Sequence, residues 1–379
     1  MKIAQVTSTF PPYEGGIGNV CYNISKLLAL RGHDITVFIP ENSRKQIKRA
    51  DGPFKLRVLR ALFSFGNASF LPILTISLKD FDIIHLHYPF FGGDIFVYLA
   101  SRLYKIPYVV TYHQDVKGAS AFKRLVFRIY NFLFRRVVIS NASRIQVLSK
   151  DHFIHSEISN IFNQSDKVAY IPNGVDVDYI DSVEEFPMLR KKFHISDNSF
   201  LLIFIGGLDD AHYFKGVHLL IHALQSLRLK AHLLIVGGGD LEDVHKDLAK
   251  KLGVSENVVF FGKRSNSDAI AILKSADALV LPSTDTESFG IVLLEAMVCC
   301  KPVIASLLPG VRVLIEDGVN GLLFPKGDVS ELVVKLTTLI DDPQLGVTMG
   351  RNGRATVVKE YQWSTIVTAL ESMYRESVT

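Results

Sequence analysis

Short runs of β-branched and aromatic residues alternate along the chain with longer stretches whose apolar residues recur every three or four positions. In the first half the strand-like runs are KIAQVTS, DITVFIP, DIIHLHY, YVVTYH, RIQVLS and KVAYIPN. Stretches with helical spacing, such as IGNVCYNISKLLALRG and FVYLASRLYK, separate them. This alternation is typical of βαβ units, so it predicts a mostly parallel sheet with helices on its faces.

The same alternation begins again in the second half of the chain. Between the two halves, residues 173–187 (NGVDVDYIDSVEEFP) contain an Asn-Gly turn, an acidic run and a proline, which mark a junction. We therefore expect two doubly wound α/β domains, residues 1–178 and 179–360. The final segment, residues 361–379, has the pattern of an amphipathic helix and is expected to pack back on the N-terminal domain.

Composition supports two folded domains. The chain has 379 residues, of which 48% are hydrophobic and 21% charged, so it can bury large cores. Its three cysteines form neither a disulfide framework nor a CxxC pair, and the N-terminus runs directly into a strand pattern. These features favour a cytoplasmic protein without a secretion signal.

The net charge of +4 hides a basic surplus in the first half of the chain. Residues 117–144 contain seven lysines and arginines and no acid. Within them, helical spacing at residues 122–137 is typical of a core-facing helix with a solvated basic side. The alternative is that this aromatic, basic face lies on an anionic membrane. The protein would then bind peripherally to the cytoplasmic face of that membrane. The apolar positions of this helix are Phe122, Leu125, Val126, Ile129, Phe132 and Leu133.

A second segment, residues 61–78, is uncharged over nearly the length of a membrane span. Its glycine, asparagine, proline and serine residues favour an interfacial or core segment over a transmembrane helix.

Ligands of open α/β sheets bind beyond the carboxyl ends of the strands, so the turns there hold the candidate chemistry. The turn after the first strand contains Gly15, Gly16 and Gly18. It is either a tight turn or a place where backbone N–H groups approach a phosphate. A later turn, IGGLDDAHYFKG, contains Lys215, which is either a solvated charge or an anion ligand, although Asp209 and Asp210 would repel an anion.

Two glutamates bracket the turn after the strand DALVLPS. Glu287 lies in the loop, and a helix is expected to begin at about residues 288–290, which places Glu295 inside it. Eight residues at ~100° each leave the two carboxylates on different faces, but both can reach a ligand near the helix N-terminus. Glu295 is the polar residue of the run IVLLEAMV, and a buried carboxylate needs a partner.

Two histidines, His85 and His87, alternate on one strand and therefore share a face. No carboxylate or cysteine with ligand spacing accompanies them, so packed or cleft-lining histidines are the favoured interpretation. We expect no metal and no cofactor.

Taken together, these motifs resemble a known family. They look like those of the retaining, nucleotide-sugar-dependent glycosyltransferases of family 4. The motifs that carry this resemblance are ESFGIVLLEAM with KPVIAS, FPPYEGGIGNV, LLALRGHDITVF, DIIHLHYP, TYHQD, VAYIPNGVD, FKG and EDGVNGLLFPKGD. The resemblance covers nearly the whole chain. It implies the GT-B fold, in which two Rossmann-like doubly wound domains face each other across a cleft. It also implies an EC 2.4 hexosyltransferase that acts on a nucleoside diphosphate sugar and a saccharide or lipid-linked acceptor, with no nucleic acid partner.

For the C-terminal donor domain, the resemblance implies that Glu295 accepts hydrogen bonds from the ribose and that Glu287 holds hydroxyls of the transferred sugar. Lys215 would neutralise the leaving diphosphate. Backbone N–H groups at the positive end of the helix would meet the sugar or phosphate, in the turn formed by Ser288, Phe289 and Gly290.

For the N-terminal domain, the resemblance implies that Gly15 and Gly16 approach the diphosphate and that closure brings them to the donor. His113 matches the histidine that sits beside the sugar near the reacting carbon. By itself, a histidine at a strand end is more often packed or at the surface.

The chain departs from the family pattern in one functional turn. Family members usually carry an arginine shortly before the lysine, where this chain has Asp209 and Asp210, and this should weaken binding of a diphosphate. Either His212, Lys263 or Arg264 compensates, or activity is reduced. Cys300 also replaces a glycine common in the family, which we expect to be a modest packing change.

The resemblance implies displacement at the anomeric carbon with retention, by front-face attack. Three alternatives stay open: a nucleotide-sugar epimerase of the same fold, a donor-binding relative with reduced activity, and an NAD-dependent dehydrogenase. A dehydrogenase would need a G-x-G-x-x-G fingerprint, which is absent from the turn after the first strand of either domain. The base, sugar, linkage, acceptor and oligomeric state are not determined by these patterns.

Overall fold

The computed structural model describes residues 1–11, 15–41, 52–66, 68–115, 128–162, 166–227, 230–285 and 287–378. The chain divides into two compact units, Met1–Gly174 with Trp363–Thr379 and Val175–Gln362. The sequence places the domain boundary at residue 178, whereas the structure divides the chain after Gly174. The sequence places the start of the last helix at residue 361, and in the structure that helix begins at Trp363. Part of the basic segment, residues 117–127, lies outside the described residues, and with it Phe122, Leu125 and Val126.

The first unit is built on a seven-stranded sheet in the order β3-β2-β1-β6-β7-β8-β9, and every neighbouring pair is parallel. Its strands are β1 Lys2–Val6, β2 Asp34–Pro40, β3 Lys55–Leu59, β6 Ile83–Tyr88, β7 Tyr108–Tyr112, β8 Arg144–Val147 and β9 Val168–Tyr170. A separate antiparallel hairpin joins β4 Phe63–Phe65 to β5 Ala68–Phe70.

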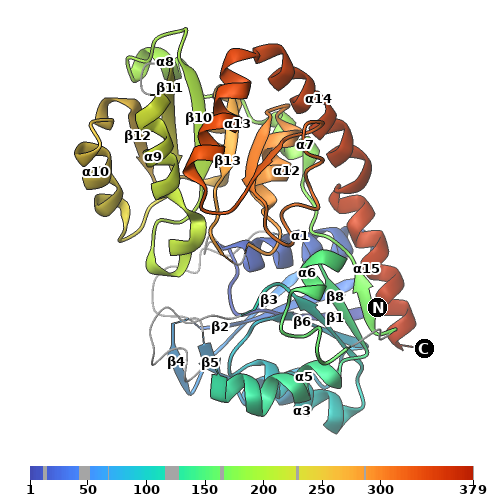
Figure 1. Ribbon diagram of the computed structural model, residues 1–379. Coiled ribbons are helices and arrows are strands. Elements are labelled where there is room, and N and C mark those ends of the chain that lie inside the picture. Colours follow the sequence, from blue (N-terminus) through green and yellow to red (C-terminus); the bar gives the residue numbers. More distant parts are fainter. Residues whose placement is uncertain are drawn as a thin grey trace. The chain divides into compact units, whose positions relative to one another are not determined.

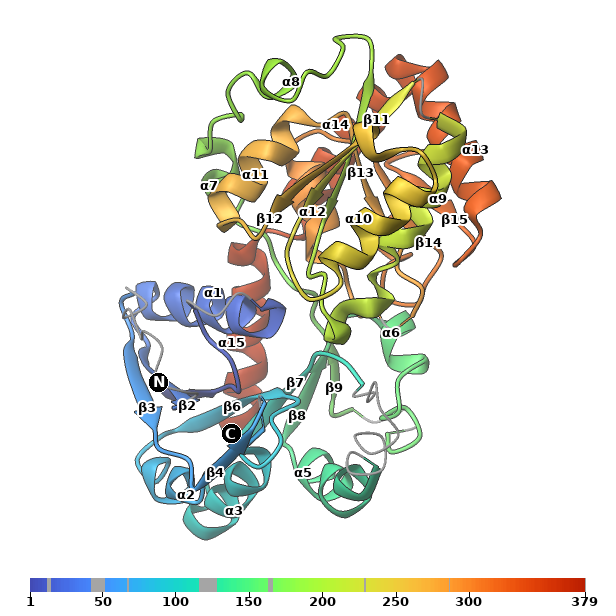
Figure 2. The ribbon, with the colours of Figure 1, turned by 90° about the vertical axis from the view of Figure 1, so that its left-hand side faces the viewer.

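Helices cover both faces of this sheet (Figures 1 and 2). One face is covered by α1 Gly16–Leu30 and the C-terminal helix α15 Trp363–Val378, which contact each other. The other face is covered by α2 Ile73–Ser77, α3 Asp94–Tyr104 and α5 Arg136–Ser140, whose apolar residues form one core with the strands. The π-helix η1 Asn131–Arg135 precedes α5, and α6 Lys150–Ile154 follows β8.

The second unit is built on a six-stranded parallel sheet in the order β12-β11-β10-β13-β14-β15. Its strands are β10 Phe200–Ile205, β11 Ala231–Val236, β12 Val258–Gly262, β13 Ala278–Leu281, β14 Val303–Ser306 and β15 Leu322–Phe324. The helices are α7 Val177–Ser182, α8 Leu189–Lys192, α9 Val217–Leu227, α10 Glu242–Lys251, α11 Asn266–Ser275, α12 Ile291–Val298, α13 Val329–Asp341 and α14 Pro343–Glu360, with 3-10 turns η2 Asp210–Lys215 and η3 Ser255–Asn257.

Both sheets reverse their strand order once, and this reversal positions the candidate chemistry. In the second unit the chain runs outward from β10 to β12 and then returns to place β13 on the other side of β10. The loops that follow β10 and β13 therefore leave the sheet edge in opposite directions. A crevice at such a switch point is where doubly wound sheets bind ligands. The two parallel sheets and their helices confirm the predicted pair of Rossmann-like α/β folds.

The interpretation of residues 122–137 as a core-facing helix is wrong for the part that the structure describes. Ile129, Phe132 and Leu133 are all exposed, and Phe132 is 83% exposed. The core beneath this segment is supplied instead by Val138 and Ile139 of α5. Local spacing reveals that residues share a helix face, but the face that meets the sheet is decided by neighbouring elements.

The uncharged segment 61–78 forms the β4-β5 hairpin and α2. Leu71, Leu74 and Leu78 are buried in the core, whereas Ile73 and Ile76 are exposed. Across the described ranges, none of the helices combines the length and apolar character that a membrane-spanning segment requires.

Candidate functional site

The switch point of the second unit brings Lys215 and Glu287 into direct contact. Lys215 ends the turn that follows β10, and Glu287 lies in the loop that follows β13. Lys215 Nζ donates a hydrogen bond to Glu287 Oε2 over 2.5 Å, and Ser283 Oγ donates to the same oxygen over 3.2 Å. Only 17% of the lysine side chain and 11% of the glutamate side chain is exposed. A shielded cation and anion therefore meet where this fold holds its ligands.

The two loops are held together by their backbones as well. Gly216 has φ +71°, and a Cβ at this position would lie 2.0 Å from the carbonyl oxygen of Pro282. Beside it, the backbone N–H and the hydroxyl of Thr284 both donate to the carbonyl of Phe214, over 2.7 Å and 3.2 Å. Only glycine permits this approach, so the sequence Lys-Gly fixes the lysine at the edge of β13.

The turn at the start of α12 has the form expected of a ligand-binding helix N-terminus. Gly290, with φ +79°, is the residue before the helix, and no side chain caps it. The backbone N–H of Leu293 donates to the carbonyl of Gly290 over 2.9 Å, so the N–H groups that precede it in this turn are the ones left for a ligand or solvent. Phe289 is buried, and its ring lies 6.1 Å from that of Tyr361. The backbone of Gly310 packs closely against Ser288, since a Cβ on Gly310 would lie 2.4 Å from the carbonyl oxygen of Ser288.

Glu295 lies farther along α12, away from the Lys215–Glu287 pair. Asn266 Nδ2, at the start of α11, donates a hydrogen bond to Glu295 Oε1 over 3.5 Å. Burial raises the pKa of this carboxyl, and the hydrogen bond from Asn266 only partly opposes the shift. The carboxylate is thus poorly compensated within the protein. The sequence-based expectation that it needs further hydrogen-bond donors has its physical basis here.

In the turn after β10, where the family arginine is missing, Asp209 pairs with His212 of the same turn. His212 Nδ1 lies 2.8 Å from Asp209 Oδ1, and the backbone N–H of His212 donates to the same oxygen. One of the two acids is therefore engaged with one of the proposed compensating residues.

The other two compensating candidates, Lys263 and Arg264, follow β12, two strands away from β10 in the sheet. Arg264 lies over the ring of Phe261, with 6.0 Å between its Cζ and the ring centroid.

In the first unit, His113 immediately follows β7. Its backbone N–H donates to the carbonyl of Tyr88, and its Nε2 lies 3.1 Å from Nδ1 of His87. His113 is only 4% exposed, and burial lowers its pKa to about 3. His85 and His87 are completely buried and share one face of β6. The prediction of packed histidines is confirmed, and they lie in one hydrogen-bonded cluster with His113.

The three glycines at the start of α1 have separate structural roles. Gly15 precedes the helix, and Gly16 is its first residue, where a Cβ would meet nothing within 4 Å. At Gly18, by contrast, a Cβ would lie 2.9 Å from the carbonyl oxygen of Thr9. Gly18 therefore allows the turn to pack on the helix, and Gly16 leaves open space at the helix N-terminus.

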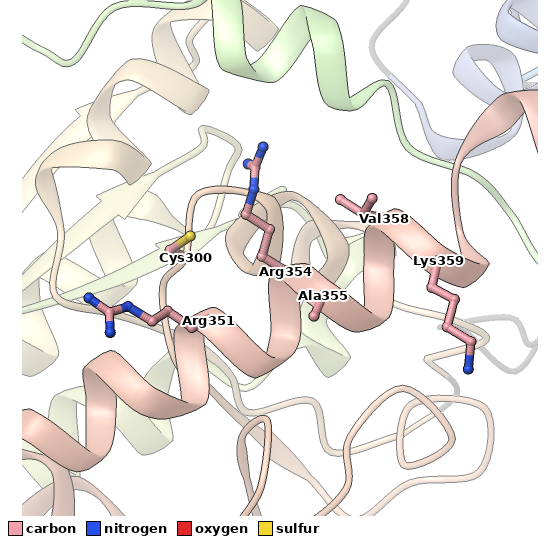
Figure 3. Close-up of a pocket in the computed structure, with 6 residues that line it drawn as sticks. All are labelled: Cys300, Arg351, Arg354, Ala355, Val358 and Lys359. Atoms are coloured by element: carbon pink, nitrogen blue, oxygen red, sulfur yellow. The ribbon is translucent and has the colours of Figure 1, made fainter.

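A surface hollow in the second unit lies elsewhere, at the C-terminal end of α12. It is lined by Cys300 and by one side of α14, with Arg351, Arg354, Ala355, Val358 and Lys359 (Figure 3). Arg354 is already engaged, since it forms two hydrogen bonds with the carboxylate of Asp181. Cys300 has φ +55° and packs its carbonyl against Gly350. A positive φ favours glycine, which explains why the family has a glycine at this position. The change to cysteine therefore strains the backbone and is not one of packing alone.

Several polar residues beside the histidines were not singled out from the sequence, namely Gln5, Thr111, Gln146 and Tyr374. Each is completely buried and hydrogen-bonded. The available signal was a glutamine or threonine inside an otherwise apolar strand, as in KIAQVTS and RIQVLS. Among the described residues, no group of three or more His, Cys, Asp or Glu side chains is arranged to hold a metal ion.

Comparison with known families gives two matches in succession along the chain. Residues 14–179 match the model described as Glycosyltransferase Family 4, and residues 185–356 match the model described as Glycosyl transferases group 1. The two models meet close to the division between the two units.

Curated relatives are similar over almost their full lengths. An uncharacterized glycosyltransferase of Methanocaldococcus jannaschii is 28% identical, over 99% of this chain and 98% of its own. A phosphatidyl-myo-inositol mannosyltransferase of Mycobacterium leprae is 26% identical over 100% and 98%. The O-antigen chain mannosyltransferase C of Escherichia coli is 28% identical over 99% and 98%.

Solved structures share the fold. HepE of Anabaena, crystallised with UDP and glucose, has a TM-score of 0.80 at 24% identity, over 99% of both chains. Sucrose-phosphate synthase of Thermosynechococcus elongatus has a TM-score of 0.83 at 20% identity, over 99% of this chain and 98% of its own.

Proposed function

Because the chain belongs to glycosyltransferase family 4 and has the GT-B fold, we propose that it transfers a sugar from a nucleoside diphosphate sugar, with retention of configuration. The observation that carries this proposal is the contact between Lys215 and Glu287 at the switch point of the second unit. A cation there suits a diphosphate, and a carboxylate beside it suits the hydroxyls of a sugar.

Each part of the sugar nucleotide matches the charge or hydrogen-bonding capacity of one residue in the second unit. Lys215 neutralises the diphosphate as charge develops on it, which is the largest contribution to the rate in reactions of this kind. Glu287 accepts hydrogen bonds from hydroxyls of the transferred sugar. Glu295 accepts them from the ribose, which would supply the donors that its buried carboxylate lacks. N–H groups at the start of α12, from Ser288 to Gly290, face the phosphate or sugar.

The reaction is a displacement at the anomeric carbon. The bond from that carbon to the phosphate oxygen breaks, the acceptor oxygen forms the new bond on the same face, and the acceptor proton passes to the departing phosphate. Glu287 is engaged by Lys215 and Ser283 and serves in binding rather than as a nucleophile. Because a lysine neutralises the leaving group, we propose that the reaction requires no metal ion.

The acidic turn bears on how strongly the donor is held. The backbone N–H and the ring of His212 both engage Asp209 Oδ1, so this carboxylate is turned toward its own loop and repels a diphosphate less. A competing proposal is a donor-binding relative with reduced activity, which the missing arginine favours. A nucleotide-sugar epimerase of the same fold would convert the donor without any acceptor.

We propose a saccharide or lipid-linked acceptor, in polysaccharide, lipid-linked oligosaccharide or glycolipid synthesis. Support comes from the relatives named as acting on phosphatidyl-myo-inositol and on O-antigen chains, at 26% and 28% identity over nearly their full lengths. Lipid-linked acceptors are presented at a membrane surface, so the protein would work at such a surface on the cytoplasmic side.

The first unit carries an exposed apolar face suited to that surface. It comprises Ile129, Phe132 and Leu133 of the segment that leads into α5, which lies beside α3 (Figures 1 and 2). Exposed apolar residues on α2 and α3, and exposed basic residues around them, extend it: Ile73, Ile76, Leu99 and Leu103, with Arg102, Lys105, Arg128 and Arg136. Apolar residues flanked by cations favour an anionic interface.

A donor panel tests the activity. The protein is incubated with UDP-, GDP- and ADP-sugars, with and without a membrane extract, with and without EDTA, and release of nucleoside diphosphate is followed. We expect release with one class of donor, faster with the extract and unaffected by EDTA. Release with no donor under any condition would refute the transferase proposal, and donor conversion without an acceptor would favour the epimerase.

Flotation with vesicles tests the membrane face. We expect the protein to float with vesicles that contain phosphatidylglycerol at low salt and not with pure phosphatidylcholine. The Phe132→Ser, Leu133→Ser double variant should lose flotation, whereas Val334→Ser, which changes an exposed valine of the second unit, should keep it. Absence of flotation of the unaltered protein at low salt would remove the proposal.

A further inference from the structure

Seven side chains form one continuous hydrogen-bonded series through the first unit. From His113, the contacts pass to His87 (3.1 Å), Gln5 (2.9 Å), Tyr374 (3.3 Å), His85 (2.6 Å), Thr111 (2.6 Å) and Gln146 (2.5 Å). The series crosses strands β7, β6, β1 and β8 and the C-terminal helix α15. All seven are buried, so water does not compete for these bonds. We call them the polar relay.

One end of the polar relay has a fixed polarity. Gln146 Nε2 lies 2.9 Å from the backbone carbonyl of Ile171, which can only accept a hydrogen bond. The amide NH₂ therefore faces Ile171, and the amide oxygen faces Thr111. Because that oxygen only accepts, the single hydroxyl proton of Thr111 must be donated to it.

This polarity passes through the middle of the relay without ambiguity. With its proton used, Thr111 Oγ1 can only accept from His85, so His85 carries its proton on Nε2. His85 Nδ1 is then an acceptor, and Tyr374 must donate its hydroxyl proton to it. The oxygen of Tyr374 consequently accepts from Nε2 of Gln5.

The last two steps reach His113. The amide oxygen of Gln5 faces His87 and accepts from Nε2–H of that ring. His87 Nδ1 is then an acceptor, and it takes the proton of His113 Nε2. This argument requires each histidine to carry one proton. Burial supports that state, since it lowers the pKa of His85 and of His113 to about 3 and that of His87 well below its ordinary value.

We propose that the polar relay, anchored on the Ile171 carbonyl, holds His113 as the Nε2–H tautomer, so that Nδ1 accepts a hydrogen bond from a hydroxyl of the bound sugar. The role for a sugar rests on the proposed function, whereas the tautomer follows from the relay alone. Nδ1 of His113 has no hydrogen-bond partner among the described residues. His113 then recognises a hydroxyl as a neutral acceptor and does not act as a cationic donor.

Tyr374 is the positioning residue on which the order depends most. It links His85 to Gln5, which is 369 residues away in the chain, and its hydroxyl both donates and accepts. Without that hydroxyl the Gln5 amide loses the contact that sets its orientation. Rotation of the amide would place NH₂ toward His87 and reverse the proton positions on His87 and His113. The last helix of the chain thus sets the chemistry of a histidine that follows β7 of the first unit.

The test is histidine ¹⁵N NMR on the full-length protein at pH 7.5, with the His113 signals assigned by their loss in His113→Gln. We expect a protonated, pyrrole-type Nε2 and an unprotonated, imine-type Nδ1. Addition of the sugar nucleotide that the donor panel identifies should shift the Nδ1 signal, and the nucleoside diphosphate alone should not. A protonated Nδ1 in the unaltered protein would overturn the proposal.

Tyr374→Phe should give averaged or reversed His113 signals and lower kcat about tenfold, with the KM for the donor changed less. Tyr170→Phe, which alters an exposed tyrosine of the same unit, should change neither. If Tyr374→Phe fails to fold, as judged by the fluorescence of Trp363, Thr111→Val interrupts the relay at another link, and Thr111→Ser should restore the signals. Unaltered His113 signals in a folded interrupted variant would refute the relay. Absence of turnover in the unaltered protein would refute the proposed function alone, because the tautomer is read without catalysis.

Discussion

Lys215 and Glu287 are 72 residues apart in the chain, and the distance between Lys215 Nζ and Glu287 Oε2 is 2.5 Å. Their loops leave adjacent strands, β10 and β13, on the two sides of the sheet's switch point. In the unliganded protein the two charges satisfy each other. A bound sugar nucleotide must replace this contact, with its diphosphate at Lys215 and its sugar hydroxyls at Glu287. Mutation of one residue at a time can therefore separate diphosphate binding from sugar binding.

Removal of either charge should therefore have different effects. Lys215→Met should weaken binding of nucleoside diphosphate at least about tenfold and lower the free energy of unfolding by about 1–3 kcal/mol, because it leaves a shielded carboxylate without its cation. Glu287→Gln should keep nucleoside diphosphate affinity, since Lys215 is released, while kcat falls roughly a hundredfold. Calorimetric titration and steady-state rates measure these effects.

The matched control is Lys230→Met, which breaks the exposed pair with Asp341 in the same unit. Surface pairs contribute about 0–1 kcal/mol, so neither affinity nor stability should change appreciably. Equal losses of affinity in Lys215→Met and Glu287→Gln would contradict the separate roles.

Glu295→Gln should weaken nucleoside diphosphate binding roughly tenfold, because an amide oxygen is a weaker acceptor for ribose hydroxyls than a carboxylate. Burial raises the pKa of Glu295 in the folded protein, so its charge is unfavourable there. The unaltered protein should accordingly lose stability relative to the variant as the pH rises through that pKa, and the difference should shrink in acid. Denaturant unfolding at several pH values measures this, with the exposed Glu360→Gln as control. Unchanged affinity would argue against a ribose contact.

Gly216→Ala should be far more damaging than Gly253→Ala, although both glycines have positive φ, +71° and +68°. At Gly253 a Cβ meets nothing within 4 Å, so only the left-handed backbone costs about 1–2 kcal/mol. At Gly216 the Cβ would lie 2.0 Å from the Pro282 carbonyl oxygen, and the loss should reach about 3 kcal/mol or more. Calorimetric melting compares the two, and similar midpoints would show that the loops can separate without cost.

The first unit should lose stability on acidification below about pH 6. Burial lowers the pKa of His85 and His113 to about 3 and that of His87 well below its ordinary value, so the unfolded chain binds protons that the folded one does not. Asp94 acts in the opposite direction, since burial raises its pKa to about 7 and the folded state keeps that proton. A net uptake of about two protons on unfolding lowers the free energy of unfolding by about 3 kcal/mol per pH unit between pH 6 and 5.

Trp363, the single tryptophan, lies buried in α15 and reports on this unit through its fluorescence. His155→Gln, which removes an exposed histidine, should leave the slope unchanged. A flat pH profile would mean that the buried histidines are charged in the folded state.

Patterns within short windows were enough to predict the alternation of strands and helices and the start of α12 near residue 290. They sufficed because the alternation of side chains in a strand and the 3.6-residue period of a helix are local properties. The same locality explains the error at Ile129, Phe132 and Leu133. Their helical spacing is real, but nothing in the spacing says whether a sheet or solvent meets that face.

By itself the sequence determined two doubly wound domains, the turns in which the chemistry lies and, through its resemblance to a family, the class of reaction. Only the tertiary structure decided which of these groups touch. Lys215 meets Glu287 because β10 and β13 are neighbours in the sheet, and His113 is joined to Tyr374 because α15 returns to the first sheet from the far end of the chain. Strand order and the return of a helix are set by long-range packing, and the proton positions in the relay depend on every one of those contacts at once.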